Sequence, residues 1–414
     1  MKRSELFTKT SKTAPADEVS KNAQLLIRAG FVHKEMAGAY DYLPLGVRVI
    51  ENIKQIVREE MNAIKGQEMS MTTLQRREIW EITDRWDAEK VDVWFKTNLN
   101  TGGELGLAPT HEEPITDMLR QHINSYKDLP LYVYQFQTKF RNEPRPKSGL
   151  MRGREFLMKD MYDFSLDKAQ HEAFYERAAA AYTKVYERLD LGDCTYKTFA
   201  SGGVFSKYSH EYQTILDVGE DTIYMNADKT LCINQEVFTD EVLADFGAQK
   251  ADFTAHSGSE VGNIFSLGYK YSEPLGLEFT DQDGNRQYAY MGCYGIGISR
   301  LMGVIAEKFA DSKGLVWPEI IAPFKYYLIG LGEKGVKKCA ELYEAHPNLF
   351  LWDDREDARA GEKFADAELM GIPYRIVISD KTLTDDKVEI TTRMSSETKL
   401  LTVTEFTNKL GQYK

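Results

Sequence analysis

The sequence is poor in cysteine and contains no long hydrophobic run. Its four cysteines are Cys194, Cys232, Cys293 and Cys339, and none belongs to a CxxC pair. This scatter disfavours a disulfide scaffold and a cysteine-rich zinc site, and it fits a reducing compartment best. No apolar run reaches the length of about 18 residues that a membrane-spanning helix needs. We therefore predict no membrane partner.

The chain also lacks the basic excess that is typical of proteins that coat nucleic acid. It has 52 basic and 64 acidic residues, a net charge of -12. Its first 18 residues are polar and contain no apolar segment of a secretory signal. Because Glu5, Asp17 and Glu18 disfavour a mitochondrial presequence, we expect a cytoplasmic protein in preference to one in an organellar matrix.

The composition is otherwise that of a globular protein. Apolar residues make up 42% and charged residues 28% of the 414 residues, without repeats or low-complexity tracts. This length predicts two or three domains. A linker with Pro318 and Pro323 ends the first part. After it, short apolar strands (326–330 and 374–378) alternate with a helix (359–370), which predicts a separate α/β domain from residue 324 onward.

Hydrophobic periodicity predicts a mixed organisation for the first part of the chain. Alternating Tyr and Phe residues predict a strand over 131–140, with its return strand over 156–164. Residues 228–259 lack periodicity, so we expect a small insertion or long connection there. The other expected elements are helices at 46–64, 114–122, 171–189 and 295–309 and strands at 67–74 and 286–293.

A basic segment at residues 137–160 contains seven basic and three acidic residues. Two strands joined by this loop would place Arg141, Glu143, Arg152 and Phe156 on one sheet face. Arginine can grip a phosphate with two hydrogen bonds, a carboxylate can accept from an exocyclic amine, and an aromatic ring can stack on a purine. The pattern indicates a nucleoside-triphosphate site; the alternative is a surface hairpin with cross-strand ion pairs.

A second pattern is the glycine-rich segment GCYGIGISR at 292–300. Gly295 and Gly297 would let a strand lie flat beneath a planar ring, and Arg300 could meet a terminal phosphate. Tight packing of strand on helix would explain the glycines equally well. A dinucleotide fold is disfavoured because the segment does not have the GxGxxG spacing early in a βαβ unit.

The third pattern is APTHEE at 108–113, directly before a predicted helix. Thr110 and Glu112 could hold a substrate ammonium in a pocket, although acidic residues at a helix start often only complement the helix dipole. Metal binding by His111 is disfavoured because no second histidine lies at a ligand spacing. We predict no metal site built from protein ligands alone.

In this order and spacing, the three patterns resemble the signature of class II aminoacyl-tRNA synthetases. Further segments are similar to the bacterial-type prolyl-tRNA synthetases: PTHEEPITD, QTKFRNEPRPKSGLMRGREFLMKDMYDF, SHEYQ, LGYKYSE, MGCYGIGISR, VWPEIIAPF and WDDREDARAGEKFADAELMGIP. The resemblance covers about residues 20–393. It implies an α+β class II catalytic domain, an antiparallel sheet with flanking helices, followed by a C-terminal α/β anticodon-binding domain.

The resemblance also implies domain boundaries and an activity. The catalytic domain would comprise residues 1–227 and 260–323, a short connection would comprise 228–259, and the anticodon-binding domain 324–414. The expected activity is ATP-dependent attachment of L-proline to tRNA(Pro) through a prolyl-adenylate, with Mg²⁺ bridging the phosphates. Arg141 and Arg300 would be the catalytic residues.

The resemblance assigns the remaining site residues by group. ATP would be bound by Arg141, Glu143, Arg152, Phe156, Gly295, Gly297 and Arg300. Proline would be bound by Thr110, Glu112, Arg141, Met158, Asp160, Tyr162 and His210. The tRNA would be bound by Arg145 and Lys147 at the acceptor end and by Asp354, Arg355 and Arg393 at the anticodon.

Two departures from the family pattern are visible. Thr72 and Arg76 stand where the first class II motif usually has prolines; that motif builds the dimer interface, and a homodimer is still expected. The interval 228–259 is too short for the editing insertion of many bacterial members, so it resembles the short form. A separate trans-acting deacylase would then remove alanine mistakenly attached to tRNA(Pro).

Two other interpretations compete with this one. One is a synthetase-like regulatory or tRNA-binding protein without charging activity, but such proteins commonly lose a motif arginine or the anticodon domain, and this chain keeps both. The other is a class II enzyme for threonine or serine. The THEE segment in this setting and the absence of zinc ligands oppose it.

Overall fold

The computed structural model describes residues 1–144, 146–203 and 205–412. The chain divides into two compact units. The first comprises Met1–Glu35, Tyr40–Ile53 and Ile305–Lys414, and the second comprises Met36–Ala39 and Lys54–Val304. The domain boundaries given above stay predictions. In the described part of the chain, every helix is too short or too polar to cross a membrane.

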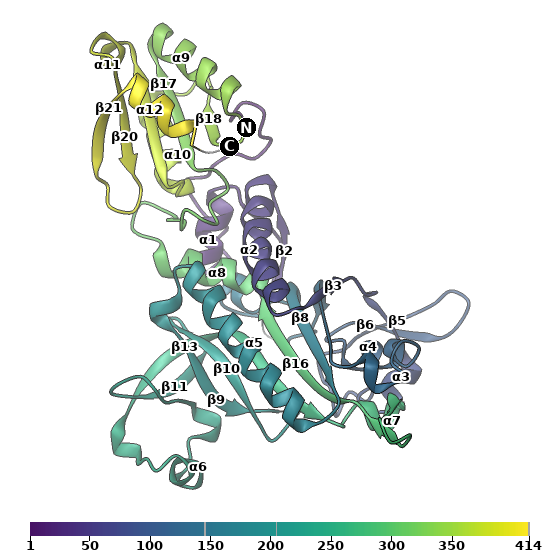
Figure 1. The fold of residues 1–414 in the computed structure, drawn as a ribbon. Helices are drawn as coiled ribbons and strands as arrows, with labels where there is room; N and C mark the ends of the chain where they lie inside the picture. Colours follow the sequence, from purple (N-terminus) through teal and green to yellow (C-terminus); the bar gives the residue numbers. More distant parts are fainter. Residues whose placement is uncertain (145, 204, 413–414) are drawn as a thin grey trace. The chain divides into compact units, whose positions relative to one another are not determined.

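The second unit is built on a large sheet, which Figure 1 shows in teal and green. Within the described residues the sheet has nine strands in the order β10-β9-β12-β11-β13-β16-β8-β7-β3. β3 is parallel to β7 and β12 to β9, and the other neighbours are antiparallel. The strands are β3 (Gln67–Met69), β7 (Leu131–Phe140), β8 (Glu155–Ser165), β9 (Thr195–Ser201), β10 (Tyr208–Ile215), β11 (Asp221–Asn226), β12 (Cys232–Asn234), β13 (Phe253–Gly268) and β16 (Tyr290–Gly297). The expected antiparallel catalytic sheet is confirmed.

The long helix α5 (Lys168–Arg188) covers one face of this sheet (Figure 1). It buries an apolar stripe that includes Phe174, Ala178 and Tyr182. The Tyr182 hydroxyl lies 2.6 Å from the Nζ atom of Lys159 on β8. Since side chains alternate along a strand, Met158 and Asp160 point to the opposite face of the sheet.

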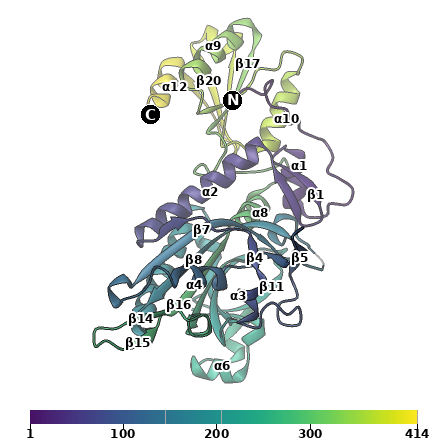
Figure 2. The ribbon, with the colours of Figure 1, turned by 90° about the vertical axis from the view of Figure 1, so that its right-hand side faces the viewer.

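Several short elements of the same unit lie near α4, which Figure 2 shows beside α3. A tryptophan cluster lies in α3 and the segment after it, where the rings of Trp80 and Trp86 lie 4.7 and 5.0 Å from that of Trp94. These elements are β4 (Leu74–Arg76), α3 (Arg77–Glu81), β5 (Phe95–Asn98), β6 (Glu104–Leu107), α4 (Glu112–Leu119), α7 (Ser272–Leu275), β14 (Glu278–Thr280) and β15 (Arg286–Tyr288). The short helix α6 (Asp240–Asp245) belongs to another part of the unit, where Leu243 packs with Ile233 of β12.

Three expected elements of the second unit differ from the structure in type or continuity. The strand expected at 67–74 ends at Met69, because the backbone of Met71 bonds to the side chains of Gln135 and Gln137 instead of a neighbouring strand. The strand expected at 286–293 is interrupted at Ala289, whose amide bonds to Leu277. Residues 253–259, expected in a connection, form the first half of β13.

In the first unit, the described residues of the C-terminal part form a five-stranded sheet in the order β18-β17-β19-β20-β21. β17 is parallel to β18 and β19, and the last two pairs are antiparallel. Tyr326, Trp352 and Phe406 belong to its buried core. This confirms the expected α/β domain. The elements of this part are β17 (Tyr326–Leu331), α9 (Gly332–Ala345), β18 (Phe350–Asp353), α10 (Ala360–Met370), β19 (Tyr374–Ser379), α11 (Asp380–Thr384), β20 (Lys387–Thr392), β21 (Thr398–Thr402) and α12 (Val403–Leu410).

The remaining elements are short segments near the start of the chain and two longer helices. The expected helix at 46–64 is confirmed as α2, one of the longest in the chain. The helix expected at 295–309 begins later, because β16 continues as far as Gly297. These elements are α1 (Lys21–Arg28), β1 (Val32–Met36), β2 (Ala39–Tyr42), α2 (Pro44–Ala63) and α8 (Ile298–Phe309).

Candidate active site

A cavity of about 150 Å³ opens to solvent on the sheet face opposite α5. Strands β8, β13 and β16 form its floor, and the segments before α4 and after β7 form its sides. It brings together most of the residues that the sequence predicted for ATP and proline. These are Thr110, Glu112, Arg141, Glu143, Arg152, Phe156, Met158, Asp160, Gly295, Gly297 and Arg300.

The register of β8 and β16 orders these residues along the cavity. Gly297 lies opposite Met158, and Gly295 lies opposite Asp160, so β16 runs from Cys293 at one end of the cavity towards Arg300 at the other. We call the two ends the arginine end, with Arg141, Glu143, Arg152, Phe156 and Arg300, and the Glu112 end, with Thr110, Glu112, Met158, Asp160 and Cys293.

At the arginine end, the predicted nucleotide residues lie in or beside the loop between β7 and β8. The Arg141 guanidinium lies 5.3 Å from the centre of the Phe156 ring. Arg152 Nη2 is 3.0 Å from Glu143 Oε2, and the Arg152 side chain is 43% exposed. Burial lowers the pKa of Arg141, while the Glu260 carboxylate opposes that shift. These charged and partly exposed side chains are suited to binding a polyanion that stays partly hydrated and paired with counter-ions.

Arg300 closes the same end from α8. Its Nε atom donates to Met151 O over 2.6 Å, and its Nη1 atom lies 3.5 Å from Glu260 Oε2. A Cβ atom on Gly297 would come within 3.0 Å of the Arg300 Cβ. Glycine at this position therefore leaves room for the arginine over the end of the strand.

The Glu112 end is enclosed, and Glu112 is fully buried. Its Oε2 atom accepts a hydrogen bond from the Thr110 hydroxyl at 2.5 Å, and its Oε1 atom accepts one from Cys293 Sγ at 3.0 Å. Burial raises the pKa of the Cys293 thiol well above its usual range, and the charge of Glu112 adds to this rise. Cys293 is therefore a neutral donor, and Glu112 presents a fixed carboxylate to the cavity.

Asp160 supplies a second carboxylate at this end. Its Oδ2 atom accepts from Lys139, Gln135 and Tyr162 at 2.8–2.9 Å, whereas its Oδ1 atom is buried and has no partner among the described residues. Burial alone would raise the pKa of Asp160, but the charge of Lys139 and the hydrogen bonds hold it below its usual value. A buried acceptor without a partner is costly, so Oδ1 is suited to a donor on a ligand.

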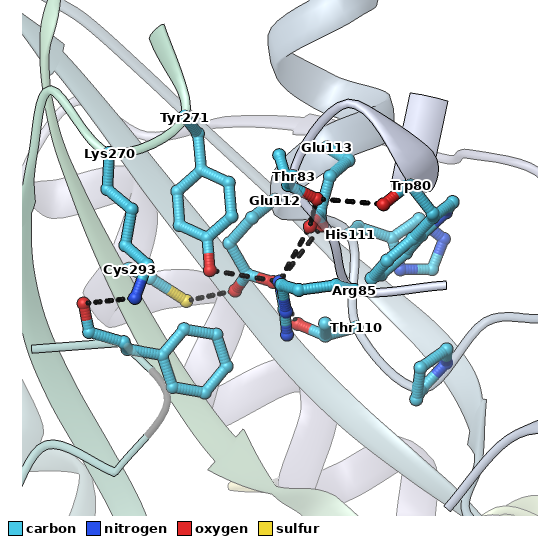
Figure 3. Close-up of polar contacts among 12 residues, drawn as sticks. Trp80, Thr83, Arg85, Thr110, His111, Glu112, Glu113, Lys270, Tyr271 and Cys293 are labelled. Carbon is cyan, nitrogen blue, oxygen red and sulfur yellow. Dashed lines mark hydrogen bonds and ion pairs between the residues drawn. The ribbon is translucent and has the colours of Figure 1, made fainter. Parts of the chain in front are cut away.

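Behind Glu112 lies a further layer, drawn in Figure 3. Arg85 Nη1 lies 2.9 and 3.0 Å from the two carboxylate oxygens of Glu113, 2.9 Å from the Tyr271 hydroxyl and 3.7 Å from Glu112 Oε2. The Thr83 hydroxyl also donates to Glu113. Burial raises the pKa of Glu113 to about 7; Arg85 opposes this rise and the charge of Glu112 adds to it.

Two predicted proline-binding residues, Tyr162 and His210, do not line the cavity. Tyr162 is fully buried and reaches the site only through its hydroxyl, which donates to Asp160 over 2.8 Å. His210 lies opposite Ile264, so it points towards α5, where its Nδ1 atom is 2.7 Å from the Tyr175 hydroxyl. These positions differ from the expectation because alternation on β10 places Glu211, not His210, on the cavity side. Their roles in proline binding stay predictions.

The comparisons with known proteins agree with this geometry. The model of the tRNA synthetase class II core domain (G, H, P, S and T) matches residues 94–309, and that of the anticodon binding domain matches residues 325–413. The Proline--tRNA ligase of Anaplasma marginale is 37% identical over 420 residues, which cover 97% of this chain and 98% of that protein. The chain belongs to the proline–tRNA ligase family. The corresponding ligase of Ehrlichia chaffeensis is 37% identical over 427 residues, covering 99% of this chain and all of that protein.

A solved structure shares the fold of this family member. The prolyl-tRNA synthetase from Cryptosporidium parvum, complexed with halofuginone and AMPPNP, superposes with a TM-score of 0.76 at 18% identity. The match covers 94% of this chain and 76% of that chain. It confirms the expected class II catalytic fold with an appended anticodon-binding domain.

Sequence reasoning missed several cavity residues, of which Glu260 and Asn263 on β13 bear on the Mg²⁺ that the family implies. Both line the cavity near Arg300. The Glu260 carboxylate and the Asn263 Oδ1 atom, which is buried and has no partner in the described part of the chain, are oxygen donors of the kind that Mg²⁺ prefers. The donor set therefore fits the ion. No spacing signal marks these two residues, which belong to none of the three motifs.

The predicted tRNA residues of the acceptor-end loop are only partly described. Arg145 lies outside the described residues. Lys147 is exposed, and its Nζ atom lies 4.0 Å from Glu220 Oε1. An exposed ammonium at this distance from its neighbour keeps most of its donors for another partner.

The predicted anticodon residues lie in or beside the five-stranded sheet of the C-terminal part, and their side chains have partners within the chain. Asp354 accepts from the Ser4 amide and hydroxyl. Arg355 binds Asp353 and Asp366, each at 2.7–2.8 Å. Arg393 is only 5% exposed and donates to both carboxylate oxygens of Asp311. Their role in reading bases stays a prediction, and for Arg393 it requires breaking the ion pair with Asp311, whose side chain is 43% exposed.

Proposed function

We propose that this protein attaches L-proline to tRNA(Pro) in two steps at the cavity described above, with ATP as the energy source. The observation that carries the proposal is the convergence of Arg141 and Arg300 on the same cavity as the buried carboxylate of Glu112. One cavity thus offers cations to a triphosphate and an anion to an amino-acid ammonium. Membership of the proline–tRNA ligase family supports the same reaction.

ATP would occupy the arginine end. Phe156 would stack on the adenine ring, Glu143 would accept from its amine, and Gly295 and Gly297 would leave space for the adenosine. Arg152 and Arg300 would hold the outer phosphates, and Arg141 the α-phosphate. Mg²⁺, when bound through Glu260 and Asn263, would neutralise phosphate charge as the pyrophosphate departs.

Proline would occupy the Glu112 end. Its secondary ammonium has two N–H donors, and Glu112 and the unpartnered Asp160 Oδ1 atom are two acceptors for them. Thr110 holds the Glu112 carboxylate, and Met158 offers an apolar wall to the pyrrolidine ring. The proline carboxylate would then point towards Arg141, between the two ends.

The chemistry follows from these positions. The proline carboxylate attacks the α-phosphorus of ATP, the bond to pyrophosphate breaks, and the terminal hydroxyl of tRNA then attacks the prolyl-adenylate with loss of AMP. No side chain has to act as a strong general base. Positioning and electrostatic stabilisation by the arginines supply most of the acceleration.

Several partners belong to the same proposal. The C-terminal domain would read the anticodon, with Asp354, Arg355 and Arg393 as candidate contacts, and Arg145 and Lys147 would meet the acceptor end. A homodimer would form through the segment around Thr72, where Leu74 is 54% exposed. We place the protein in the cytoplasm.

A separate deacylase is proposed to correct errors. A pocket that fits proline cannot fully reject alanine, because the few missing methylene contacts are worth only about 1–3 kcal/mol each. We therefore expect some alanine-dependent pyrophosphate exchange and no hydrolysis of alanyl-tRNA(Pro) by this chain. Incubation of purified protein with preformed alanyl-tRNA(Pro) checks this; deacylation well above the buffer rate would reveal an editing centre in the chain itself.

The test of the main proposal is pyrophosphate exchange with each of the twenty amino acids, followed by charging of tRNA(Pro). Proline should give the highest kcat/KM by far, and tRNA(Pro) should become charged. Exchange with serine or threonine in place of proline would identify another class II specificity. Absence of exchange in folded, ATP-binding protein would favour the regulatory interpretation.

A further inference from the structure

Arg85 lies outside the cavity but contacts two parts of its wall. Its side chain is buried, with the residue only 7% exposed. On one side Nη1 lies 3.7 Å from Glu112 Oε2. On another, the guanidinium lies 5.0 Å from the centre of the Phe205 ring. Both Glu112 and Phe205 line the cavity, so a change at Arg85 reaches the cavity through them.

Two buried carboxylates lie side by side in the sequence at the start of α4. Glu112 and Glu113 are adjacent in sequence and both are fully buried. Two carboxylates that share a dry site cannot both ionise without a compensating cation. Arg85 supplies that cation to Glu113 through contacts at 2.9 and 3.0 Å, and it lies farther from Glu112 (Figure 3).

The position of Arg85 is fixed by three other segments. Its carbonyl oxygen accepts a hydrogen bond from Trp94 Nε1 at 2.9 Å. Its guanidinium lies 5.2 Å from the Trp80 ring and contacts the hydroxyl of Tyr271, which is fully buried. A guanidinium held this closely cannot swing towards Glu112 and compete with a ligand cation.

We infer that Arg85 is a positioning residue for proline recognition: by pairing with Glu113 it leaves the Glu112 carboxylate ionised and available to the substrate ammonium, and it supports the Phe205 ring in the cavity wall. The inference rests on the proposed function. It assigns no chemistry to Arg85 itself, which acts only through the residues that line the cavity.

The electrostatic balance around Glu112 depends on groups from several elements. Those that are charged in their ordinary state are Arg85, Glu113, Lys139, Arg141 and Asp160. Those that are ordinarily neutral are His111, Tyr162, Tyr271 and Cys293. Lys139 is already paired with Asp160 at 2.9 Å. Arg85 is thus the cation committed to the Glu112–Glu113 pair.

Removal of Arg85 should therefore weaken proline binding specifically. In Arg85→Gln the two carboxylates would share a proton, so only a fraction of the protein would present an ionised Glu112. The apparent dissociation constant for proline equals the intrinsic constant divided by the fraction of protein with an ionised Glu112. If that fraction is about one tenth, the KM for proline rises about tenfold. The pKa of Glu113 is already about 7 with Arg85 in place, and loss of that cation raises this pKa further, so the KM of this variant for proline should fall as the pH rises above 7.

The experiment measures proline-dependent pyrophosphate exchange by the full-length protein for Arg85→Gln, Glu113→Gln and the double variant. Arg85→Gln should raise the KM for proline about tenfold and that for ATP less than about threefold. The double variant removes both members of the pair and leaves Glu112 as a lone carboxylate, so its KM for proline should return to within about threefold of the unmodified value. Arg77→Gln is the matched control, because Arg77 is 48% exposed in the nearby helix α3.

A purely structural role predicts different results. It would lower kcat and raise both KM values together, without dependence on pH and without rescue by the second substitution. Either that pattern or an unchanged KM for proline in Arg85→Gln overturns the inference. Should Arg85→Gln fail to fold, Arg85→Lys keeps the charge, and a KM for proline and a pH profile close to the unmodified ones are then required.

Failure of the inference differs from failure of the proposed function. If the unmodified protein shows no proline-dependent exchange, the function is wrong and the variants carry no meaning. If the unmodified protein shows exchange and the Arg85 variants match it, the inference alone is wrong.

Discussion

The two ends of the cavity hold their charged residues in different ways. At the arginine end, Arg152 is 43% exposed and pairs with the Glu143 side chain at 3.0 Å. At the Glu112 end, Glu112 and Glu113 are fully buried and their partners are buried around them. A triphosphate carries several charges and can be bound in partly solvated surroundings. A small amino acid carries one ammonium, so water must be excluded from the site for the attraction between that ammonium and a carboxylate to be strong.

This comparison suggests where substitutions act. The Glu112 end is preorganised by a network in which each group depends on its neighbours, so single changes there should be costly and selective. The arginine end is built from separate ion pairs that water can replace in part. Arg141, at the arginine end, is proposed to meet both the α-phosphate and the proline carboxylate, so its loss should affect both substrates.

The largest effect is expected for Arg141→Ala. The α-phosphate and the proline carboxylate both depend on this guanidinium, and arginines that stabilise phosphoryl charge contribute on the order of 10³-fold. Proline-dependent pyrophosphate exchange should fall by about that factor while the melting temperature changes little. Arg120→Ala, which alters an exposed arginine at the end of α4, serves as the control. Near-normal exchange in Arg141→Ala would contradict the proposal that Arg141 contacts both the α-phosphate and the proline carboxylate.

The next effect concerns selectivity. Glu112→Gln removes the buried carboxylate opposite the ammonium, and breaking a buried charge pair costs about 3–5 kcal/mol. The KM for proline should rise about 100-fold or more, while that for ATP should stay within about threefold. Asp117→Asn on the same helix is the matched control. Equal rises in both constants would mean that Glu112 only supports the start of α4.

A smaller effect is expected at the arginine end. Arg152→Ala should raise the KM for ATP about tenfold, because a charge-assisted hydrogen bond contributes about 1.5–3 kcal/mol and this side chain is partly exposed. The KM for proline should not change. High salt should reduce the difference between variant and unmodified protein, since exposed charges are screened. A salt-independent loss would show that the arginine end is as dry as the Glu112 end.

The smallest effect on the kinetic constants is expected for Lys159→Met. Lys159 lies on β8 between Met158 and Asp160. Burial lowers the pKa of Lys159 from 10.5 to about 7, so between these two pH values the unfolded chain binds the extra proton. The free energy of unfolding of the unmodified protein should then rise with pH relative to the variant, by about 1 kcal/mol per pH unit from pH 7 to 9. Denaturant titrations check this slope.

Kinetic measurements complete that test. Both KM values should stay within about threefold in Lys159→Met, because this side chain points to α5 and away from the cavity. A large change in either KM would show that residues on the sheet face covered by α5 also affect substrate binding.

The sequence alone determined the local patterns. Alternating aromatic residues predicted Leu131–Phe140 to the residue, and the residue types of the three motifs, with the family resemblance, predicted most of the cavity wall. Arg141, Glu112 and Gly295 were found because hydrogen bonding, charge and backbone freedom are properties of the residue itself and of its near neighbours in the chain.

Only the tertiary structure decided which face of a strand each residue occupies and which distant residues meet. A one-residue change in register exchanges the two faces of a strand, so SHEYQ alone could not show that His210 points to α5. Glu260 and Arg85 belong to no motif, and they reach the site through β13 and through the tryptophan cluster. Such contacts depend on side-chain packing between segments far apart in the chain, which local patterns do not encode.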